Sequence, residues 1–164
     1  MKNTGKTAFA GLVLFVAATA LLIYFIHGGK TASPLPKSFT SNGGTYNFTA
    51  YAYNLSTAEK GLMNATVTNS TLMLFAFNSS GIYPFWMKNT YYPLDIFWVY
   101  ATSKTSGRIV YAITVQPCID FSANQTSCPI YIPTSKANYV IEAHAGFLKS
   151  QGISQYDNIT FNYN

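Results

Sequence analysis

Short stretches in which apolar and polar residues alternate dominate the chain after residue 45, and this period of two predicts β-strands. Aromatic and β-branched residues fill these stretches, as is typical of strands. The predicted strands cover residues 45–53, 71–77, 94–100, 108–115, 138–145 and 158–163. Residues 102–107 are rich in Ser, Thr and Gly and predict a hairpin loop between the third and fourth of these strands.

Two short helices interrupt the strands. In "STAEKGLM" (residues 56–63), Ser56 is a predicted N-cap, Glu59 can complete a capping box, and Gly61 can end the helix after about one turn. "GFLKSQG" (residues 146–152) predicts a second short helix. The pattern contains no long amphipathic helix and no internal repeat. We therefore expect a mainly β fold: a compact antiparallel or mixed β-barrel-like domain with one or two short helices.

The N-terminal part of the chain has a different character. Residues 9–26 carry no charge and no proline. A helix of about 18 residues, the length of this run, is long enough to cross a bilayer. Lys2 and Lys6 precede this run and favour a cytoplasmic N-terminus with the remainder outside. We expect a cytoplasmic segment (1–8), a single transmembrane anchor (9–26), a Gly/Pro/Ser-rich linker (27–44) and an extracytoplasmic domain (45–164). A signal peptide cleaved near Ala20 is the alternative.

Two further features agree with an exported domain. Seven N-x-S/T sequons are candidate glycosylation sites: Asn47, Asn54, Asn64, Asn69, Asn78, Asn124 and Asn158. Cys118 and Cys128 are the two cysteines of the chain, and the nine residues between them do not match a C-x-x-C metal or redox motif. Outside the cell, we expect these cysteines to form a disulfide.

The charge distribution argues against nucleic-acid binding. The formal net charge is +5, but Lys2, Lys6, Lys30 and Lys37 precede residue 38, so that the six basic and five acidic residues that follow leave 6 − 5 = +1. Charged residues make up 9% of the chain and aromatic residues 16%. Because few carboxylates would lose native charge on protonation, an acidic outside environment is one hypothesis.

Four residues are candidates for catalysis: Asp95, Lys88, Glu142 and His144. On a strand, Asp95 shares a face with Phe97 and Val99, and its partners are expected to be Lys88 or the amides of Asn89 and Thr90. Asp95 either pins the loop before its strand or faces a ligand.

Glu142 and His144 point to the same side of their strand and could begin an acid/base pair. A metal site needs further ligands, so we expect no metal and no cofactor. No nucleophile motif and no phosphate-binding glycine loop is present.

The stretch "FWMKNT" (residues 85–90) combines aromatic, basic and amide side chains. Exposed aromatic side chains of this kind can stack on sugars or anchor a protein partner. The candidate binding surface comprises Trp86, Lys88, Asn89, Thr90 and Asp95. The alternative is that Phe85, Trp86 and Met87 close one end of the barrel.

Several motifs together resemble a known family. "FWMKNT" is followed closely by "PLDI" (residues 93–96), and "GLM" (61–63), "MLFAF" (73–77), "YVIEAHAG" (139–146) and "GISQYDNITF" (152–161) occur in the order typical of domain of unknown function 192. The resemblance implies a compact, mostly β domain that is often exported or membrane-anchored, and it implies no established activity. The family typically has Gly before the Asp that opens the last strand, whereas this chain has Tyr156. A tight turn there is therefore in question.

Three functions follow from these features. The preferred one is a membrane-anchored extracytoplasmic binding module for an envelope carbohydrate or a surface protein, without a nucleic-acid partner. The second is a hydrolase-like envelope enzyme that uses Asp95 and Lys88 with Glu142 or His144. The third is a structural subunit of a surface layer or filament, because low charge suits close lateral packing.

Overall fold

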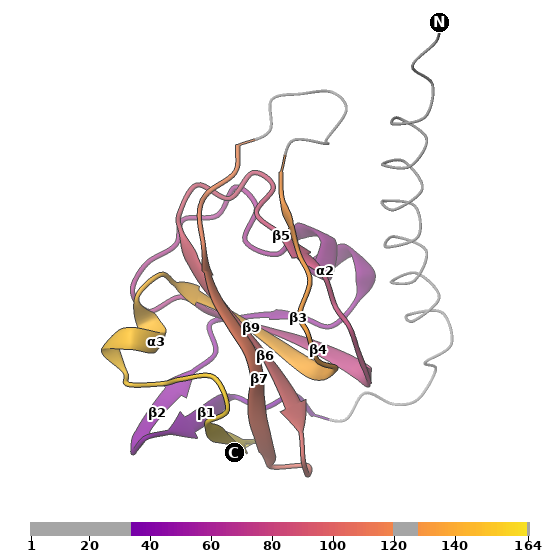
Figure 1. The fold of residues 1–164 in the computed structure, drawn as a ribbon, viewed down its shortest axis with the longest axis vertical. Coiled ribbons are helices and arrows are strands. Elements are labelled where there is room, and N and C mark those ends of the chain that lie inside the picture. The colour runs from indigo at the N-terminus through magenta and orange to yellow at the C-terminus, as the bar shows by residue number, and fades with distance from the viewer. Residues whose placement is uncertain (1–33, 120–127, 164) are drawn as a thin grey trace, which may run out of the picture.

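Eight strands form one curled sheet with the shape of a half-barrel, and two short strands form a separate ribbon (Figure 1). The computed structural model describes residues 34–119 and 128–163. The predicted cytoplasmic segment, the anchor and residues 27–33 of the predicted linker lie outside the described residues, as does Asn124. Within the described ranges, no helix has the length and apolar character that a membrane span requires.

The mainly β prediction is confirmed, and the sheet is mixed because β3 and β4 are parallel while its other neighbouring pairs are antiparallel. In chain order the elements are β1 (Ser38–Ser41), β2 (Gly44–Asn47), β3 (Ala50–Ala52), α2 (Leu55–Lys60), β4 (Leu72–Gly81), β5 (Phe85–Trp86), β6 (Leu94–Ala101), β7 (Ser106–Val115), β8 (Ile130–Tyr131), β9 (Ala137–His144), α3 (Phe147–Ser150) and β10 (Asn158–Asn162). The strands of the large sheet are ordered β2-β1-β10-β7-β6-β9-β4-β3, and β5 pairs with β8.

The N-terminal boundary of the domain differs from the prediction. Residues 38–44, which fall within the predicted linker, contain β1 and the start of β2. Asn42 and Gly43 both have positive φ and form the two-residue connection of this hairpin, for which an Asn-Gly pair is a strong signal. Phe39 is fully buried. The hairpin therefore belongs to the folded domain.

The first helix forms where the sequence predicts it, but its cap differs. Asn54, not Ser56, is the N-cap: its side chain accepts a hydrogen bond from the Thr57 amide, and Thr57 rather than Glu59 completes the capping box. The helix ends at Gly61, which has a φ of +47°. Polar residues at several neighbouring positions could each cap this helix, so the path of the chain after β3 makes the choice.

Both faces of β6 are buried. Leu94, Ile96 and Trp98 pack into one apolar cluster, which also contains Met87, while Phe97 and Val99 pack into a second cluster on the other face. The Trp98 side chain is fully buried, and its Nε1 donates to the carbonyl of Tyr83 at 2.8 Å. Alternation along a strand thus assigns each side chain of β6 to one of two separate interiors.

Asp95 lies on the same face of β6 as Phe97, as predicted, but the partners predicted for it are wrong. Its Oδ1 accepts from the Thr114 hydroxyl at 2.7 Å, and its Oδ2 accepts from the amides of Gly146 and Leu148 at 3.0 and 2.9 Å. The carboxylate therefore joins β6 to β7 and to the start of α3. It does not hold the 88–90 turn, because that turn follows Met87, which packs on the opposite face of β6.

The turn before β10 keeps a tight conformation without glycine. Tyr156 has a φ of +79°, its amide donates to the carbonyl of Ile109 at 2.8 Å, and Arg108 Nε donates to its carbonyl at 3.1 Å. The Arg108 guanidinium also lies 5.4 Å from the Tyr156 ring centre. These contacts offset the strain of a positive φ at a bulky residue.

Removing the Asp95 carboxylate should weaken the fold. We expect Asp95→Ala to lower the free energy of unfolding by about 3 kcal/mol, because two backbone amides and a hydroxyl lose a buried charged acceptor. Asp95→Asn should cost less, because an amide oxygen can still accept from both backbone N–H groups. Urea unfolding measures both values. Asp157→Ala, which removes a more exposed acceptor for the Ser154 amide, is the control. A loss below about 1 kcal/mol for Asp95→Ala would contradict this role.

Candidate functional site

The ribbon of β5 and β8 presents Trp86 on the side opposite to the core. Phe85 packs edge-on against Phe75 and Trp98, with ring centres 4.7 and 5.6 Å apart, so its side chain points toward the large sheet. Trp86 follows Phe85 in the strand and therefore points the other way, beside its cross-strand partner Ile130. Phe85 and Met87 thus pack against the interior as the plug alternative expects, whereas Trp86, partly buried like Phe85, belongs to neither core cluster.

The 88–90 turn gives its three residues different roles. Lys88 directs its ammonium to the Trp86 ring, 5.4 Å from the ring centre. Asn89 adopts a φ of +51°, which places its carbonyl as acceptor of the Asn64 amide at 2.8 Å. Thr90 is buried, and its hydroxyl donates to the Lys88 carbonyl at 3.4 Å. Lys88 and Asn89 are both partly exposed, whereas Thr90 is buried and stabilises the turn.

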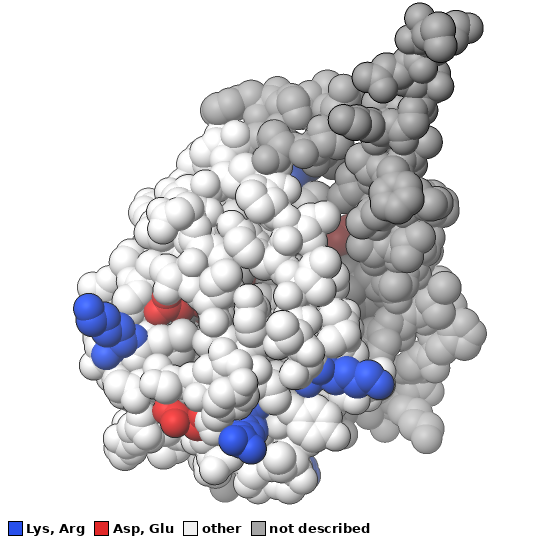
Figure 2. Space-filling view, viewed as in Figure 1, with Lys and Arg blue, Asp and Glu red and all other residues white. Residues whose placement is uncertain are grey.

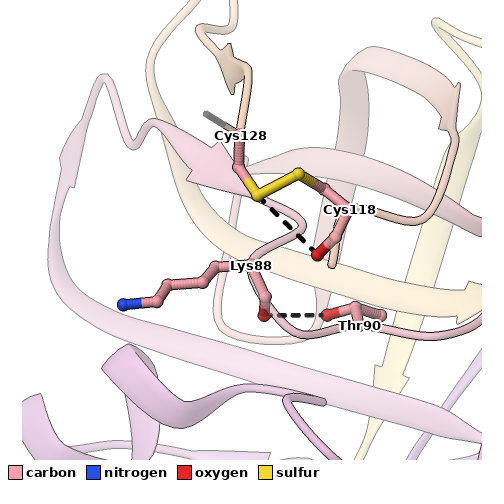
Figure 3. The surroundings of a disulfide bond; sticks show 4 residues. All are labelled: Lys88, Thr90, Cys118 and Cys128. Atoms are coloured by element: carbon pink, nitrogen blue, oxygen red, sulfur yellow. Dashed lines mark hydrogen bonds between the residues drawn. A yellow bond between two sulfur atoms is a disulfide. The ribbon is translucent and has the colours of Figure 1, made fainter. Parts of the chain in front are cut away.

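The predicted disulfide between Cys118 and Cys128 is confirmed, with an S–S distance of 2.08 Å. Figure 3 shows it beside the 88–90 turn, with the Lys88 side chain extending away from the sulfur atoms. The backbone of Cys118 forms bridges with both Lys88 and Thr90, and Cys128 begins the segment that leads into β8. The disulfide therefore fixes the turn and the ribbon relative to each other.

Together these elements form a mainly apolar outer face, which we name the Trp86 surface and define as Trp86, Lys88, Ile130 and Ile132. Ile130 is 36% exposed and Ile132 is 59% exposed. Lys88 supplies the one charge of this set. The sequence singles out Trp86 and Lys88 but not the two isoleucines, since no sequence pattern shows that residues 130–131 pair with β5.

Glu142 is a buried carboxyl group without a hydrogen bond on one of its oxygens. Its side chain is 4% exposed, and Oε2 has no partner among the described residues. Across the sheet it lies between Met73 on β4 and Ile96 on β6, which are both apolar. Burial raises the pKa of Glu142 from an ordinary 4.5 to about 8. The group is therefore a neutral carboxylic acid at pH 7.

His144 lies on the same face of β9 as Glu142, as predicted, at the end of the strand. Its Nδ1 lies 2.9 Å from the carbonyl of Ala145, a geometry that suits an N–H donor. Among the described residues, no group of three or more His, Cys, Asp or Glu side chains is placed to hold a metal ion.

The structure separates the four candidate catalytic residues. Asp95 and Ile96 are consecutive on β6 and point to opposite faces, and Glu142 pairs with Ile96. Asp95 and Glu142 therefore lie on opposite faces of one sheet. A single cleft lined by Asp95, Lys88 and Glu142 is incompatible with this arrangement, because the sheet itself lies between the two carboxyl groups.

Gly61 is a residue whose place near a candidate group the sequence does not reveal. A Cβ atom at Gly61 would lie 3.7 Å from Glu142 Oε2 and 3.4 Å from the Phe75 ring. The end of α2 therefore covers Glu142 with backbone alone. The glycine after "STAEK" is recognisable as a helix end, but contact with a strand about 80 residues further along the chain has no local signal.

Burial of Glu142 predicts an unusual dependence of stability on pH. The folded state holds the proton more tightly than the unfolded state, so stability is greatest below the unfolded pKa of 4.5 and falls as pH rises toward about 8. We expect the free energy of unfolding to fall by about 1.4 kcal/mol per pH unit in this window. Urea unfolding between pH 5 and pH 8 measures the slope.

Two variants test the assignment of this slope. Glu142→Gln should remove it, because glutamine does not titrate. His144→Gln should retain it, because the slope is assigned to the Glu142 carboxyl group and not to its neighbour on β9. A wild-type stability that stays constant or rises from pH 5 to pH 8 would contradict the burial of an unpartnered acid.

Comparison with known proteins agrees with the fold. The model of the DUF192 family, described as an uncharacterized ACR, matches residues 39–161. A solved structure from Sinorhizobium meliloti 1021, described as a candidate transcription regulator, is 28% identical with a TM-score of 0.61, and the match covers 80% of this chain and 98% of that one. A protein of unknown function from Novosphingobium aromaticivorans DSM 12444 is similar in fold, at 24% identity, a TM-score of 0.60 and coverage of 80% and 98%.

A search of curated proteins found no match. The family match spans well over half of the chain, and it includes the 88–90 turn, Asp95, the disulfide and Glu142. The chain therefore belongs to the DUF192 family.

Proposed function

We propose that this protein is a membrane-tethered, extracytoplasmic binding module whose Trp86 surface recognises another surface protein. The observation that carries the proposal is the outward pairing of Trp86 with Ile130 beside the half-exposed Ile132. Partly exposed Trp side chains within apolar surroundings are characteristic of the centres of protein interfaces. Lys88 adds one positive charge, which can form an ion pair with an acidic residue of the partner.

A protein partner fits this surface better than a carbohydrate. Sugar recognition needs several free polar groups around an aromatic ring, and Thr90, one of the polar residues of the candidate binding surface, is buried. Asn89 uses its carbonyl to accept from the Asn64 amide. The Thr90 hydroxyl and the Asn89 carbonyl thus bond within the turn and to Asn64, whereas apolar groups of the ribbon face outward.

The separation of the carboxyl groups argues against the hydrolase alternative that uses Asp95 and Lys88. Asp95 already accepts three hydrogen bonds, and it points to the face of the sheet opposite to Glu142. A pair of carboxyl groups on the two sides of one scissile bond cannot be assembled from them.

Nucleic acid is not proposed as the partner, although one structural relative is described as a candidate transcription regulator. The net charge after residue 37 is 6 − 5 = +1. On the face in Figure 2, basic and acidic side chains of the described residues are scattered among uncharged ones without a continuous basic surface. Such a distribution offers little for a phosphate backbone.

Photo-crosslinking tests the Trp86 surface in cells that make the full chain. A photoreactive phenylalanine analogue at position 132 should yield one protein adduct of defined mass, whereas the same analogue at Tyr156, which is equally exposed, should not. Trp86→Ala should reduce the adduct at least about tenfold, as for a central interface residue. Lys88→Glu should also reduce it.

Three outcomes would contradict a protein partner. Equal adducts at positions 132 and 156 would indicate indiscriminate contact. Adducts between copies of this chain alone would favour the surface-layer or filament alternative. Binding on a glycan array that Trp86→Ala abolishes, without any protein adduct, would replace the protein by a carbohydrate.

The exported location is part of the proposal and rests on residues 9–26 and on the sequons. Six sequon asparagines lie in the described ranges, and all six are exposed: Asn47, Asn54, Asn64, Asn69, Asn78 and Asn158. Asn54 and Asn64 use their amide oxygens in hydrogen bonds, from the Thr57 amide and the Tyr91 hydroxyl. Asn47, Asn78 and Asn158 lie on strands of the sheet, and among these exposed acceptors we expect Asn47 to be modified.

Intact-mass measurement of protein from the source cells tests this expectation. Asn47→Gln should remove the mass of one glycan, because the acceptor amide is the site of attachment. Asn42→Gln, at an exposed asparagine outside any sequon, is the matched control and should change the mass only by the substitution. A wild-type mass equal to that of the bare polypeptide would contradict glycosylation.

A further inference from the structure

The segment over Glu142 is attached to the rest of the domain by few contacts. It comprises residues 61–65, which follow α2, a helix without any buried residue. Three of its hydrogen bonds are local, from the amides of residues 61, 63 and 65 to carbonyls three or four residues earlier. Its bonds to another part of the chain run through Asn64, to the Asn89 carbonyl and from the Tyr91 hydroxyl. Segments with mainly local bonds open at low free energy.

Two apolar side chains of this segment pack against the interior, the partly buried Ala65 and the buried, larger Leu62. The Leu62 side chain is 7% exposed and packs in the cluster that contains Phe75 and Ile96. Gly61, directly above Glu142, adds no side chain, and its backbone has a positive φ of +47°. Displacement of this one segment would therefore bring water to Glu142 without separating any strands of the sheet.

Among the described residues, the surroundings of Glu142 supply no other compensation for a negative charge. On β4 and β6 its direct neighbours are Met73 and Ile96, and the titratable residue on the same face of β9 is His144. On α2, Glu59 and Lys60 are both exposed to solvent. From the 88–90 turn, Lys88 is directed to the Trp86 ring. An ionised Glu142 thus gains more from water than from any of these groups.

We propose that residues 61–65 form a proton-linked lid, which stays closed while Glu142 is protonated and opens more often as pH rises, because opening hydrates the carboxylate. The chemistry is reversible proton loss from the Glu142 carboxyl group to solvent. Opening also breaks the bond between Asn64 and Asn89 and so loosens the turn that carries Lys88. The lid does not depend on the proposed binding function, although both share this turn.

Linkage gives the size and the direction of the effect. The carboxyl group has its ordinary pKa of 4.5 when the lid is open and the raised value of about 8 when it is closed. Between these values, the open fraction should rise about tenfold per pH unit, and above the upper value it should stay constant. Acid therefore closes the lid.

Amide hydrogen exchange of the full chain in detergent micelles tests the lid. Exchange rates at pH 5.5 and 7.5 are divided by the intrinsic chemical rate of each amide at that pH. Protection of the amides of Met63, Asn64 and Ala65 should fall about 100-fold from pH 5.5 to 7.5. In Glu142→Gln the protection should change less than about threefold, because no proton is released.

Two controls distinguish local opening of the lid from a general loosening of the domain. Glu59→Gln removes an exposed carboxyl group from the helix that leads into the lid and should keep the wild-type response. The amides of β6 exchange through global unfolding and should lose protection in parallel, but they should stay at least about tenfold better protected than residues 61–65 at both pH values, because the lid opens without unfolding of the sheet. An unchanged wild-type protection, an equal pH response in Glu142→Gln, or equal protection of β6 and of residues 61–65 would each overturn the proposal.

Discussion

Burial of both faces of β6 is the constraint on which the rest of the structure depends. A central strand with two covered faces must send consecutive side chains into different interiors. Leu94, Ile96 and Trp98 enter the interior covered by β5, β8 and the segment after α2, and Phe97 and Val99 enter the interior that contains Phe147 of α3. The positions of Asp95, Glu142 and His144 follow from this assignment. Asp95 lies on β6, and the other two lie on β9, which pairs with β6.

The two buried carboxyl groups, Asp95 and Glu142, have different hydrogen-bonding surroundings in the two interiors. Asp95 meets one hydroxyl and two amide donors, which stabilise its charge and join three elements. Glu142 lies on the opposite face, one residue position away across the β6–β9 pair, and its Oε2, which has no partner among the described residues, lies under the backbone of Gly61. In a chain with five carboxylic side chains, an unpaired buried acid is costly, and costly groups in native structures commonly serve a function.

The outer surface is organised by a covalent bond and by strand pairing rather than by charge. The disulfide ties Cys118, which bridges to the 88–90 turn, to the segment that forms β8. This connection holds Trp86 and Ile130 outward while Phe85 and Met87 fill the interior. The 88–90 turn also contacts the lid over Glu142 through Asn64. Surface and buried acid are thus neighbours, although they are far apart along the chain.

The sequence by itself determined the mainly β fold, the two short helices, the longer strands, the disulfide and the face on which Asp95 lies, but not the short strands β1, β5 and β8. The determined features follow from period-two alternation, from glycine and proline positions and from cysteine count, which are all local or countable properties. It also contains the Asn-Gly signal for the hairpin of β1 and β2, but a Gly/Pro/Ser-rich linker has the same composition, so the signal is ambiguous without the burial of Phe39. Only the tertiary structure decided the partners of Asp95, which lie 19 to 53 residues away. The tertiary structure alone placed Gly61 over Glu142 and Ile130 beside Trp86. Contacts between distant segments depend on strand order and register, and the local sequence pattern specifies neither.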